Sequence, residues 1–319
     1  MSLSTREYTA FVGFDVGKHS ITVHDLETGT TQEIDNTAGA IGGYVDSLPA
    51  SCFAVCEATG GYESVLLRQL LKAGIACHRA DAVKVKAFIR SFGTLAKTDA
   101  VDARALAAYG RERCQQLPLY APPQAEQAKL QALVLRRADL VALKVAETNR
   151  LKAPNSDTVA RFIKPVLKAI TTQIKAVEKE IQVLLDACEQ MGQQVSVMRT
   201  VKGVGPTTAT TLLALMPELG TLTRRQAAAL AGCAPYPNDS GARKGYRRTK
   251  GGRRDVRASL FMAALSAARH KGPLKDFYGT LIRRGKKPIV AITALMRKII
   301  VILNAKLRDL ALANQTQLS

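Results

Sequence analysis

The sequence predicts an α/β domain at the N-terminus, a helical coiled-coil middle and a mostly α-helical C-terminal domain. Over the first hundred residues, short runs rich in β-branched and aromatic residues alternate with helical patterns, which is typical of a sheet covered by helices. From about Glu126 to Glu189 the chain becomes long, helical and charged in character, and further helices are expected beyond residue 200. With 319 residues, 47% of them hydrophobic, the chain can bury more than one core. We place the domains at residues 1–120, 121–198 and 199–319.

The N-terminal domain begins with three expected strands. Residues 8–16 and 20–26 are β-rich runs separated by Gly-Lys-His, and Thr-Thr-Gln-Glu-Ile-Asp follows, which predicts a three-stranded meander. Helix, strand, helix and strand are expected next, at residues 38–48, 52–58, 62–74 and 75–80. Two more helices are expected over VKVKAFIRSF and DAVDARALAAYGRER. This order of elements resembles that of a ribonuclease H or RuvC-like α/β domain.

The middle of the chain carries a heptad pattern. Its apolar residues are spaced alternately three and four apart, at Leu167, Ile170, Ile174, Val177, Ile181, Leu184 and Cys188. A looser stripe precedes it at Leu130, Leu133, Leu140 and Leu143, and KAPNSD at residues 152–157 supplies turn residues between the two. The pattern predicts an antiparallel helical hairpin that packs on itself or on a second copy. An ordinary amphipathic pair within one domain explains so short a seam equally well.

The C-terminal domain begins with Gly-Val-Gly-Pro at residues 203–206, ahead of a Thr- and Ala-rich helix. This turn resembles the hairpin of a helix-hairpin-helix motif, whose exposed N–H groups can hold a phosphate. Any tight helix–helix turn uses the same residues. Further helices are expected over RRQAAALAGCAP, RRDVRASLFMAALSAARH and PIVAITALMRKIIVILNAKL. Arg297 and Lys298 interrupt the last, which predicts a core helix of a globular domain.

Charge is distributed unevenly along the chain. The formal net charge is +20 and the pI is near 9.9, so the partner is expected to be a polyanion, either nucleic acid or an acidic membrane. Residues 201–319 carry 22 Lys or Arg against 5 Asp or Glu, whereas residues 1–200 carry 24 against 21. The C-terminal third is therefore expected to bind most of the polyanion.

Cysteine and histidine usage argues against a zinc site. Six cysteines and four histidines are scattered along the chain without a C-x-x-C pair. No charged-then-apolar leader opens the sequence, and no run reaches the roughly 18 apolar residues of a membrane span. We therefore expect a cytoplasmic protein with reduced thiols.

Four acidic residues fall where the expected elements would bring them together. Asp15 ends the first strand, Glu57 ends the fourth, and Asp99 and Asp102 share one face of a helix. Singly, they are explained by a turn, a solvated strand end and a helix cap favoured by the dipole. Together they form the constellation with which ribonuclease H-like enzymes hold two Mg²⁺ ions about 4 Å apart. Carboxylates are the hard oxygen ligands that Mg²⁺ prefers.

A basic stretch, Pro235–Arg257, contains one serine, Ser240. In the context Asn-Asp-Ser-Gly this serine by itself is better explained as a turn residue. The cations of the stretch are expected to contact phosphates and to make binding depend steeply on salt. They are Arg243, Lys244, Arg247, Arg248, Lys250, Arg253, Arg254 and Arg257.

Five motifs, in order over residues 10–305, together resemble one known family. They are GFDVGK, CEATGGYE, KTDAVDARALA, GVGPTTA and SGARKG....TKGGRRDVRASLF. The combination is similar to the DEDD transposases of the insertion-sequence "one-ten" family, which also includes Piv-type DNA invertases. The resemblance implies a RuvC-like N-terminal domain, a coiled-coil insertion and a C-terminal transposase domain.

The resemblance also implies a site. The family's four metal-binding carboxylates fall on Asp15, Glu57, Asp99 and Asp102, and its nucleophilic serine falls on Ser240. Such an enzyme cuts and rejoins DNA with Mg²⁺ through a covalent phosphoserine. No His lies near Ser240 in the sequence, so activation is expected from the metal ions or from neighbouring guanidinium groups.

The partners implied by the resemblance are donor and target double-stranded DNA and a non-coding bridge RNA that guides the enzyme. A homo-oligomer, dimer or tetramer, working at the bacterial nucleoid is implied as well. Three alternatives stay open at this point. They are a Piv-type invertase that flips one chromosomal segment, a RuvC-like junction nuclease that uses water, and a non-enzymatic nucleic-acid-binding protein whose acids cap helices.

Overall fold

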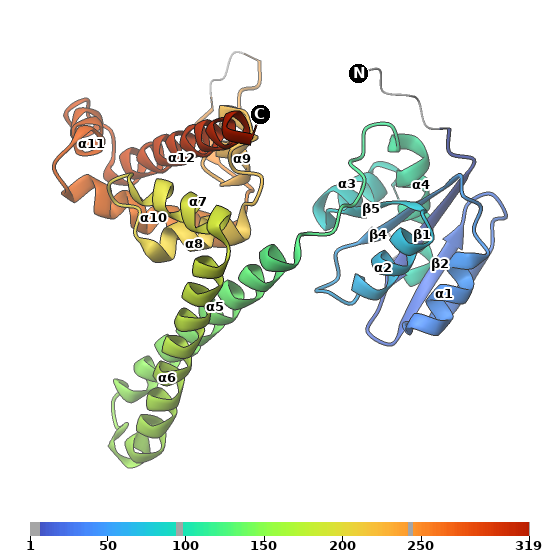
Figure 1. The fold of residues 1–319 in the computed structure, drawn as a ribbon, viewed down its shortest axis with the longest axis horizontal. Coiled ribbons are helices and arrows are strands. Elements are labelled where there is room, and N and C mark those ends of the chain that lie inside the picture. Colours follow the sequence, from blue (N-terminus) through green and yellow to red (C-terminus); the bar gives the residue numbers. More distant parts are fainter. Residues whose placement is uncertain (1–6, 94–97, 242–244, 319) are drawn as a thin grey trace. The chain divides into compact units, whose positions relative to one another are not determined.

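The structure is a computed structural model that describes residues 7–93, 98–241 and 245–318 (Figure 1). The chain divides into two compact units, Met1–Pro122 (unit 1) and Pro123–Ser319 (unit 2), which are considered separately. Helices on both sides of residue 198 share one apolar core in unit 2, and the finer division at residue 198 stays a prediction.

Unit 1 is built on a five-stranded mixed sheet. In sheet order its strands are β3 (Thr31–Asp35), β2 (Ser20–Asp25), β1 (Ala10–Val16), β4 (Cys52–Glu57) and β5 (Ala76–Ala80). The first three strands are antiparallel neighbours, while β1, β4 and β5 run parallel. The predicted α/β domain with its three-stranded meander is confirmed.

Helices cover both faces of this sheet. The helices of unit 1 are α1 (Ala38–Asp46), α2 (Ser64–Lys72), α3 (Ala82–Ser91) and α4 (Asp99–Arg113). Because side chains alternate along a strand, Val12 and Phe14 of β1 pack in one core with α1 and α2. Phe11 packs in a separate core on the other face with Phe88 of α3 and Leu106 of α4.

The backbone of α4 lies directly on β1. A Cβ at Gly13 would stand 2.0 Å from the carbonyl oxygen of Ala103 and 2.5 Å from the amide nitrogen of Ala107. Later in α4, a Cβ at Gly110 would meet Val55 and the rings of Phe53 and Phe11, nearer the start of the strands. Helix α4 therefore runs antiparallel to β1, and its first turn lies toward the carboxyl ends of β1 and β4.

Unit 2 begins with a long helical hairpin. Helix α5 (Ala125–Leu151) and helix α6 (Asp157–Ala187) lie side by side and run in opposite directions (Figure 1). At its base, Leu130, Ile181 and Leu184 enter the core of unit 2, whereas Leu143 is 49% exposed. The predicted hairpin is confirmed, and a coiled coil with a second copy stays a prediction.

The rest of unit 2 is a helical assembly with one two-stranded ribbon. The helices are α7 (Glu189–Arg199), α8 (Pro206–Leu215), α9 (Arg224–Leu230), α10 (Arg254–Arg269), α11 (Pro273–Arg283) and α12 (Pro288–Leu318), and the ribbon joins β6 (Pro235–Tyr236) to β7 (Arg248–Thr249). Helix α11 was not expected, although Pro at its first position after Gly272 is a typical start signal. The predicted mostly helical architecture is confirmed.

Helix α12 is a long apolar helix of unit 2. The segment Pro288–Thr316, with a mean hydropathy of 1.8, is the one helix among the described residues long and apolar enough to cross a membrane. Arg297 and Lys298 interrupt its apolar stretch, so it is not an unbroken apolar run of the length that a membrane span needs. Leu295, Ile299 and Leu303 are buried in unit 2, which explains the apolar composition by packing, as predicted for a core helix.

The Gly-Val-Gly-Pro turn has a packing explanation. Gly203 has a φ of +93°, and a Cβ there would lie 2.5 Å from the carbonyl oxygen of Ala263 and 2.7 Å from the amide nitrogen of Ala267 in α10. Gly205 precedes α8 as its N-cap, and Pro206 opens the helix. Close contact with α10 therefore accounts for Gly203, and phosphate binding by this turn stays a prediction.

The contact between β1 and α4 predicts a stability difference between two glycines. Gly13→Ala is expected to destabilise the fold by about 1–3 kcal/mol or more, because rigid backbone atoms must move apart. The matched control is Gly43→Ala in α1, where a Cβ meets nothing within 4 Å. Alanine loses less backbone conformational entropy on folding than glycine does, so this control is expected to be more stable than the wild type by roughly 0.5–1 kcal/mol. Thermal unfolding of the full chain followed by circular dichroism measures both, and equal melting temperatures would contradict the prediction.

Candidate functional site

Asp15 and Glu57 stand side by side at the carboxyl end of two parallel strands. Phe14 of β1 pairs with Cys56 of β4, so Asp15 and Glu57 occupy the next position along both strands. Phe11 and Val55, an even number of residues earlier on their strands, belong to the core on the α4 side. By alternation, both acids therefore lie on the sheet face that α4 covers.

Asp99 and Asp102 approach the same end of the sheet from above. Both lie in the first turn of α4, the end directed toward the carboxyl ends of β1 and β4. Asp102 is half-buried and Asp99 is exposed. These four acids, which come from β1, β4 and α4, are called the carboxylate edge below.

The capping explanation of Asp99 is wrong. The N-cap of α4 is Thr98, whose hydroxyl accepts a hydrogen bond from the amide of Val101 at 3.3 Å. Asp99 is instead the first helical residue. The helix dipole still favours acids in this turn, but the cap does not require them.

The carboxylate edge has the donor chemistry of a magnesium site without a preformed coordination shell. Within residues 7–93, 98–241 and 245–318, no group of three or more His, Cys, Asp or Glu side chains lies close enough to hold a metal ion. Like charges repel, so these carboxylates can approach coordination distance only with a cation between them. The residues fit the ion by ligand type and by convergence on one edge.

Ser240 lies on the exposed turn between β6 and β7, at a cavity of about 450 Å³. Asp239 braces this turn, because its carboxylate accepts a hydrogen bond from the amide of Gly245 at 3.0 Å. The cavity, called the serine cavity below, is lined by Tyr236, Pro237, Asn238, Ser240, Gly245, Tyr246, Arg248 and Lys250. None of these described lining residues is a histidine, and the charged ones among them are Arg248 and Lys250.

The structure divides the cations of the basic stretch into two groups. Arg247, Arg248, Lys250 and Arg254 are exposed. Arg253 instead donates to both carboxylate oxygens of Glu218, at 2.6 and 2.8 Å, and to the carbonyl oxygen of Leu215.

These hydrogen bonds from Arg253 hold the pKa of Glu218 below its ordinary value. Arg257 donates to the carbonyl oxygen of Gly251 at 3.1 Å. Arg243 and Lys244 lie outside the described residues. Phosphate contacts by all eight cations stay a prediction, and Arg253 also has a role inside the fold that the sequence did not reveal.

Two segments of the chain match known protein families. A DEDD transposase family of the IS110 type matches residues 12–154, and the transposase family IS116/IS110/IS902 matches residues 195–279. Pilin gene-inverting proteins of Moraxella lacunata and Moraxella bovis are each 26% identical over 259 residues, 80% of either chain. The uncharacterized 44.8 kDa protein of insertion element IS116 from Streptomyces clavuligerus is 28% identical over 183 residues, 55% of this chain and 45% of that protein.

The chain belongs to the IS110 family of transposases and their Piv-type relatives. It is therefore an enzyme, a DNA recombinase that acts by phosphoryl transfer, and a non-enzymatic binding protein is excluded. Its DEDD domain implies the use of a divalent metal, and DNA is its substrate. The first of the two matched segments contains the carboxylate edge, and the second contains the serine cavity.

A buried glutamate of the recombinase, which the sequence did not single out, shapes the loop after Glu57. The Glu63 side chain, 3% exposed, accepts hydrogen bonds from the amides of Gly61 at 2.8 Å and Thr59 at 3.2 Å, and it pairs with Arg79 at 2.8 Å. Burial alone raises its pKa, but the N–H donors and Arg79 outweigh burial and hold the pKa of Glu63 below 4.5. The signal in the sequence was an acid two residues after a Gly-Gly pair. Glu63 thereby fixes the backbone that leaves Glu57.

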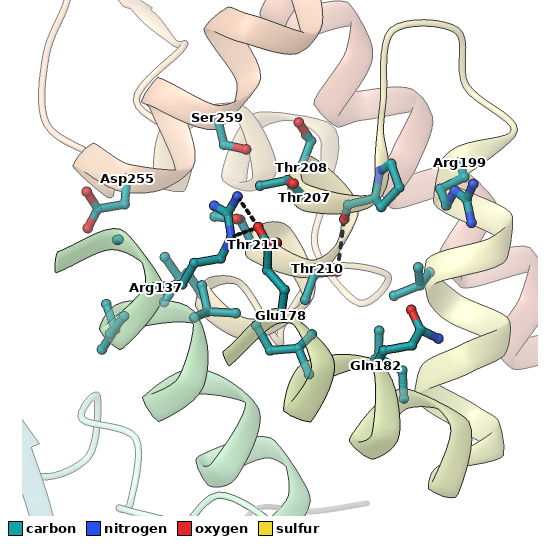
Figure 2. Close-up of a pocket in the computed structure, with 18 of the residues that line it drawn as sticks. Arg137, Glu178, Gln182, Arg199, Thr207, Thr208, Thr210, Thr211, Asp255 and Ser259 are labelled. Carbon is teal, nitrogen blue, oxygen red and sulfur yellow. Dashed lines mark hydrogen bonds and ion pairs between the residues drawn. The ribbon is translucent and has the colours of Figure 1, made fainter. Parts of the chain in front are cut away.

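A second, larger cavity of the recombinase contains none of the predicted site residues. It measures about 1200 Å³ and lies between the base of the α5–α6 hairpin and helices α8 and α10 (Figure 2). Arg137 of α5 and Glu178 of α6 form an ion pair of 2.7 Å across it. The α8 wall carries threonine hydroxyls, and Asp255 and Ser259 project from α10. Its lining carries four acids, Glu178, Asp186, Glu189 and Asp255, against two cations, Arg137 and Arg199, so it lacks the excess positive charge expected of a phosphate site.

The Glu63 network predicts a pH-dependent loss of stability. Glu63→Gln is expected to cost about 1–3 kcal/mol, because the neutral amide leaves Arg79 and the loop amides poorly satisfied. Since the folded pKa of Glu63 is lowered, its contribution is complete above 4.5 and disappears as pH falls through the folded pKa. Urea unfolding of both proteins as a function of pH measures the difference. Exposed Glu33→Gln is the control, and a penalty that persists undiminished in acid would contradict the assignment.

Proposed function

We propose that this protein is the transposase of an insertion sequence, and that it cuts and rejoins DNA by attack of Ser240 on a phosphodiester. The observation that carries the proposal is the convergence of Asp15, Glu57 and the first turn of α4 at one edge of one sheet face. Carboxylates that converge in this way offer the oxygen ligands that metal-assisted phosphoryl transfer uses.

We assign Asp15, Glu57, Asp99 and Asp102 to hold divalent cations, two Mg²⁺ ions by preference. Bound ions of this kind activate the attacking oxygen and stabilise the leaving oxygen of an in-line displacement. Asp15 and Glu57 occupy the same position on adjacent parallel strands, so both would contribute carboxylate oxygens from the strand ends. Asp99 and Asp102, in the first turn of α4, would supply the remaining carboxylates from the helix.

In the proposed reaction Ser240 gives up its hydroxyl proton, and its Oγ forms a bond to phosphorus. The bond from phosphorus to the departing DNA oxygen breaks, and that oxygen takes up a proton. One phosphodiester is exchanged for another, so rejoining needs no ATP. Arg248 and Lys250 line the same cavity as Ser240, where their N–H donors can stabilise charge on the equatorial phosphate oxygens.

Inversion is the second candidate reaction. The two relatives matched over 80% of their length are named pilin gene-inverting proteins, and inversion uses the same strand exchange within one DNA molecule. A junction nuclease that uses water shares the carboxylate edge but gives Ser240 no role. The fate of Ser240 therefore separates recombination from hydrolysis.

We further propose a guide RNA and an oligomeric enzyme. The excess of 22 basic over 5 acidic residues in residues 201–319 supplies charge for more nucleic acid than one short duplex. Exchange between two duplexes involves four strands and so needs several active sites, which a dimer or tetramer provides. Ser240 lies in unit 2 and the acids lie in unit 1, so a site assembled from two subunits is compatible with the chain.

Substitution of Ser240 and Asp102 tests the mechanism. Ser240→Ala is expected to abolish the protein–DNA adduct that survives denaturation, and Asp102→Asn is expected to abolish cleavage with DNA binding retained. Ser266→Ala and Asp81→Ala are the controls, because Ser266 lies outside both cavities and Asp81 caps α3 at a cost of about 1 kcal/mol. Rejoining by Ser240→Ala, or cleavage by Asp102→Asn at the wild-type rate, would overturn the proposal.

The guide RNA is tested by sequencing the RNA that copurifies with the protein. One structured transcript from the flank of the protein's own gene is expected, with segments complementary to both donor and target DNA. Copurified RNA should dissociate at high salt, because phosphate contacts dominate such binding. A population of cellular RNA without enrichment of any transcript would reject guidance and leave the recombinase assignment intact.

A further inference from the structure

Two tyrosines form exposed parts of the wall around Ser240. Tyr236 lies in β6 and pairs with Arg248 of β7 across the ribbon, and Tyr246 precedes β7. Tyr236 is 44% exposed and Tyr246 is 70% exposed, and both line the serine cavity. Two aromatic rings thus stand in solvent within a stretch that is otherwise polar and charged.

Packing does not account for these rings. Tyr109 is buried in the core of unit 1, where aromatic rings usually contribute their apolar area. Tyr236 and Tyr246 belong to neither the core of unit 2 nor the partly buried layer packed against it. Exposed aromatic rings beside cations are how proteins commonly hold unpaired bases, since every base has a π face that stacks.

The cavity has the size and the polar groups for one nucleotide. Its volume of about 450 Å³ lies within the range of small-ligand sites. Arg248 and Lys250 on its wall can contact phosphate oxygens, and the Asn238 amide offers both a donor and an acceptor to a base edge. The tyrosine rings can therefore stack on the base, the Asn238 amide can hydrogen-bond to the edge of the base, and the two cations can contact the phosphate.

We propose that Tyr236 and Tyr246 stack on an unpaired nucleotide of the DNA strand that Ser240 attacks, directly beside the scissile phosphate. The proposal rests on the proposed role of Ser240, because Ser240 shares the cavity and so defines which strand occupies it. A base held outside the DNA helix would align the scissile phosphorus with the Ser240 hydroxyl for in-line attack. It would also determine which phosphate is cut. The tyrosines are positioning residues, and the stacking is tolerant of base identity.

The absence of tryptophan from the chain makes the stacking directly measurable. The sequence contains no Trp, so Tyr246→Trp introduces the single indole of the protein. Addition of a short single-stranded oligothymidylate to the full-length variant is expected to quench its fluorescence strongly. Phe162→Trp, at a 63% exposed aromatic position of α6 outside both cavities, is the matched control and is expected to change little.

Three outcomes of this titration decide the proposal. Quenching by the oligothymidylate, together with its loss on an abasic oligonucleotide of equal length that still binds, supports stacking on a base. Equal quenching of the Tyr246→Trp and Phe162→Trp variants overturns it, because proximity of DNA alone then explains the signal. Quenching by oligouridylate and not by oligothymidylate also overturns it, because the occupant would be RNA.

Cleavage provides the second measurement. Tyr246→Leu is expected to lower the rate of cleavage about tenfold or more, while Tyr246→Phe retains it, since stacking needs the ring and not the hydroxyl. A rate for Tyr246→Leu equal to that of the wild type overturns the proposal, and Tyr236→Leu repeats the test at the second ring.

Ser240→Ala separates the hypothesis that Ser240 is the nucleophile from the hypothesis that the tyrosines stack on a nucleotide. If this variant still cleaves, the nucleophile is wrong, whereas indole quenching reports on the nucleotide cavity independently.

Discussion

The contact on which the catalytic arrangement depends is the direct packing of α4 on β1. Only a residue without a side chain fits at Gly13, where the backbone of α4 passes within van der Waals distance of the strand. That contact fixes the height of the helix above the sheet and, with Gly110 further along, its direction. Asp99 and Asp102 reach the strand end that carries Asp15 and Glu57 because α4 is held in this way. A larger residue at position 13 would lift the helix and separate the acids.

Unit 2 follows a different principle, in which a helical core supports an exposed turn that carries Ser240. Helices α10 and α12 are buried over much of their length, and Arg253 at the start of α10 is tied to Glu218. Ser240 lies outside this core, beside a ribbon in which β6 and β7 pair over two residues each. The arrangement leaves the serine exposed to solvent on a stable scaffold, which is the usual setting of functional loops.

Charge is divided in keeping with these roles. The acids of the carboxylate edge lie in unit 1, while the exposed cations Arg248 and Lys250 line the cavity of Ser240 in unit 2. Glu63, six residues after Glu57, is engaged instead by loop amides and Arg79, so this acid serves the fold of the loop.

The sequence by itself determined the element types of unit 1, the helical hairpin, the family and the candidate residues, because periodicity and short motifs are local properties. It did not reveal α11, the Glu63 network, the Arg253–Glu218 pair or the cap at Thr98, and it offered Asp99 as a cap that the structure does not use. Only the tertiary structure decided that Asp15 and Glu57 share one register position and that Tyr236 and Tyr246 share a cavity with Ser240. These are distances between residues far apart in the chain, set by strand pairing and backbone packing, and no local pattern encodes them.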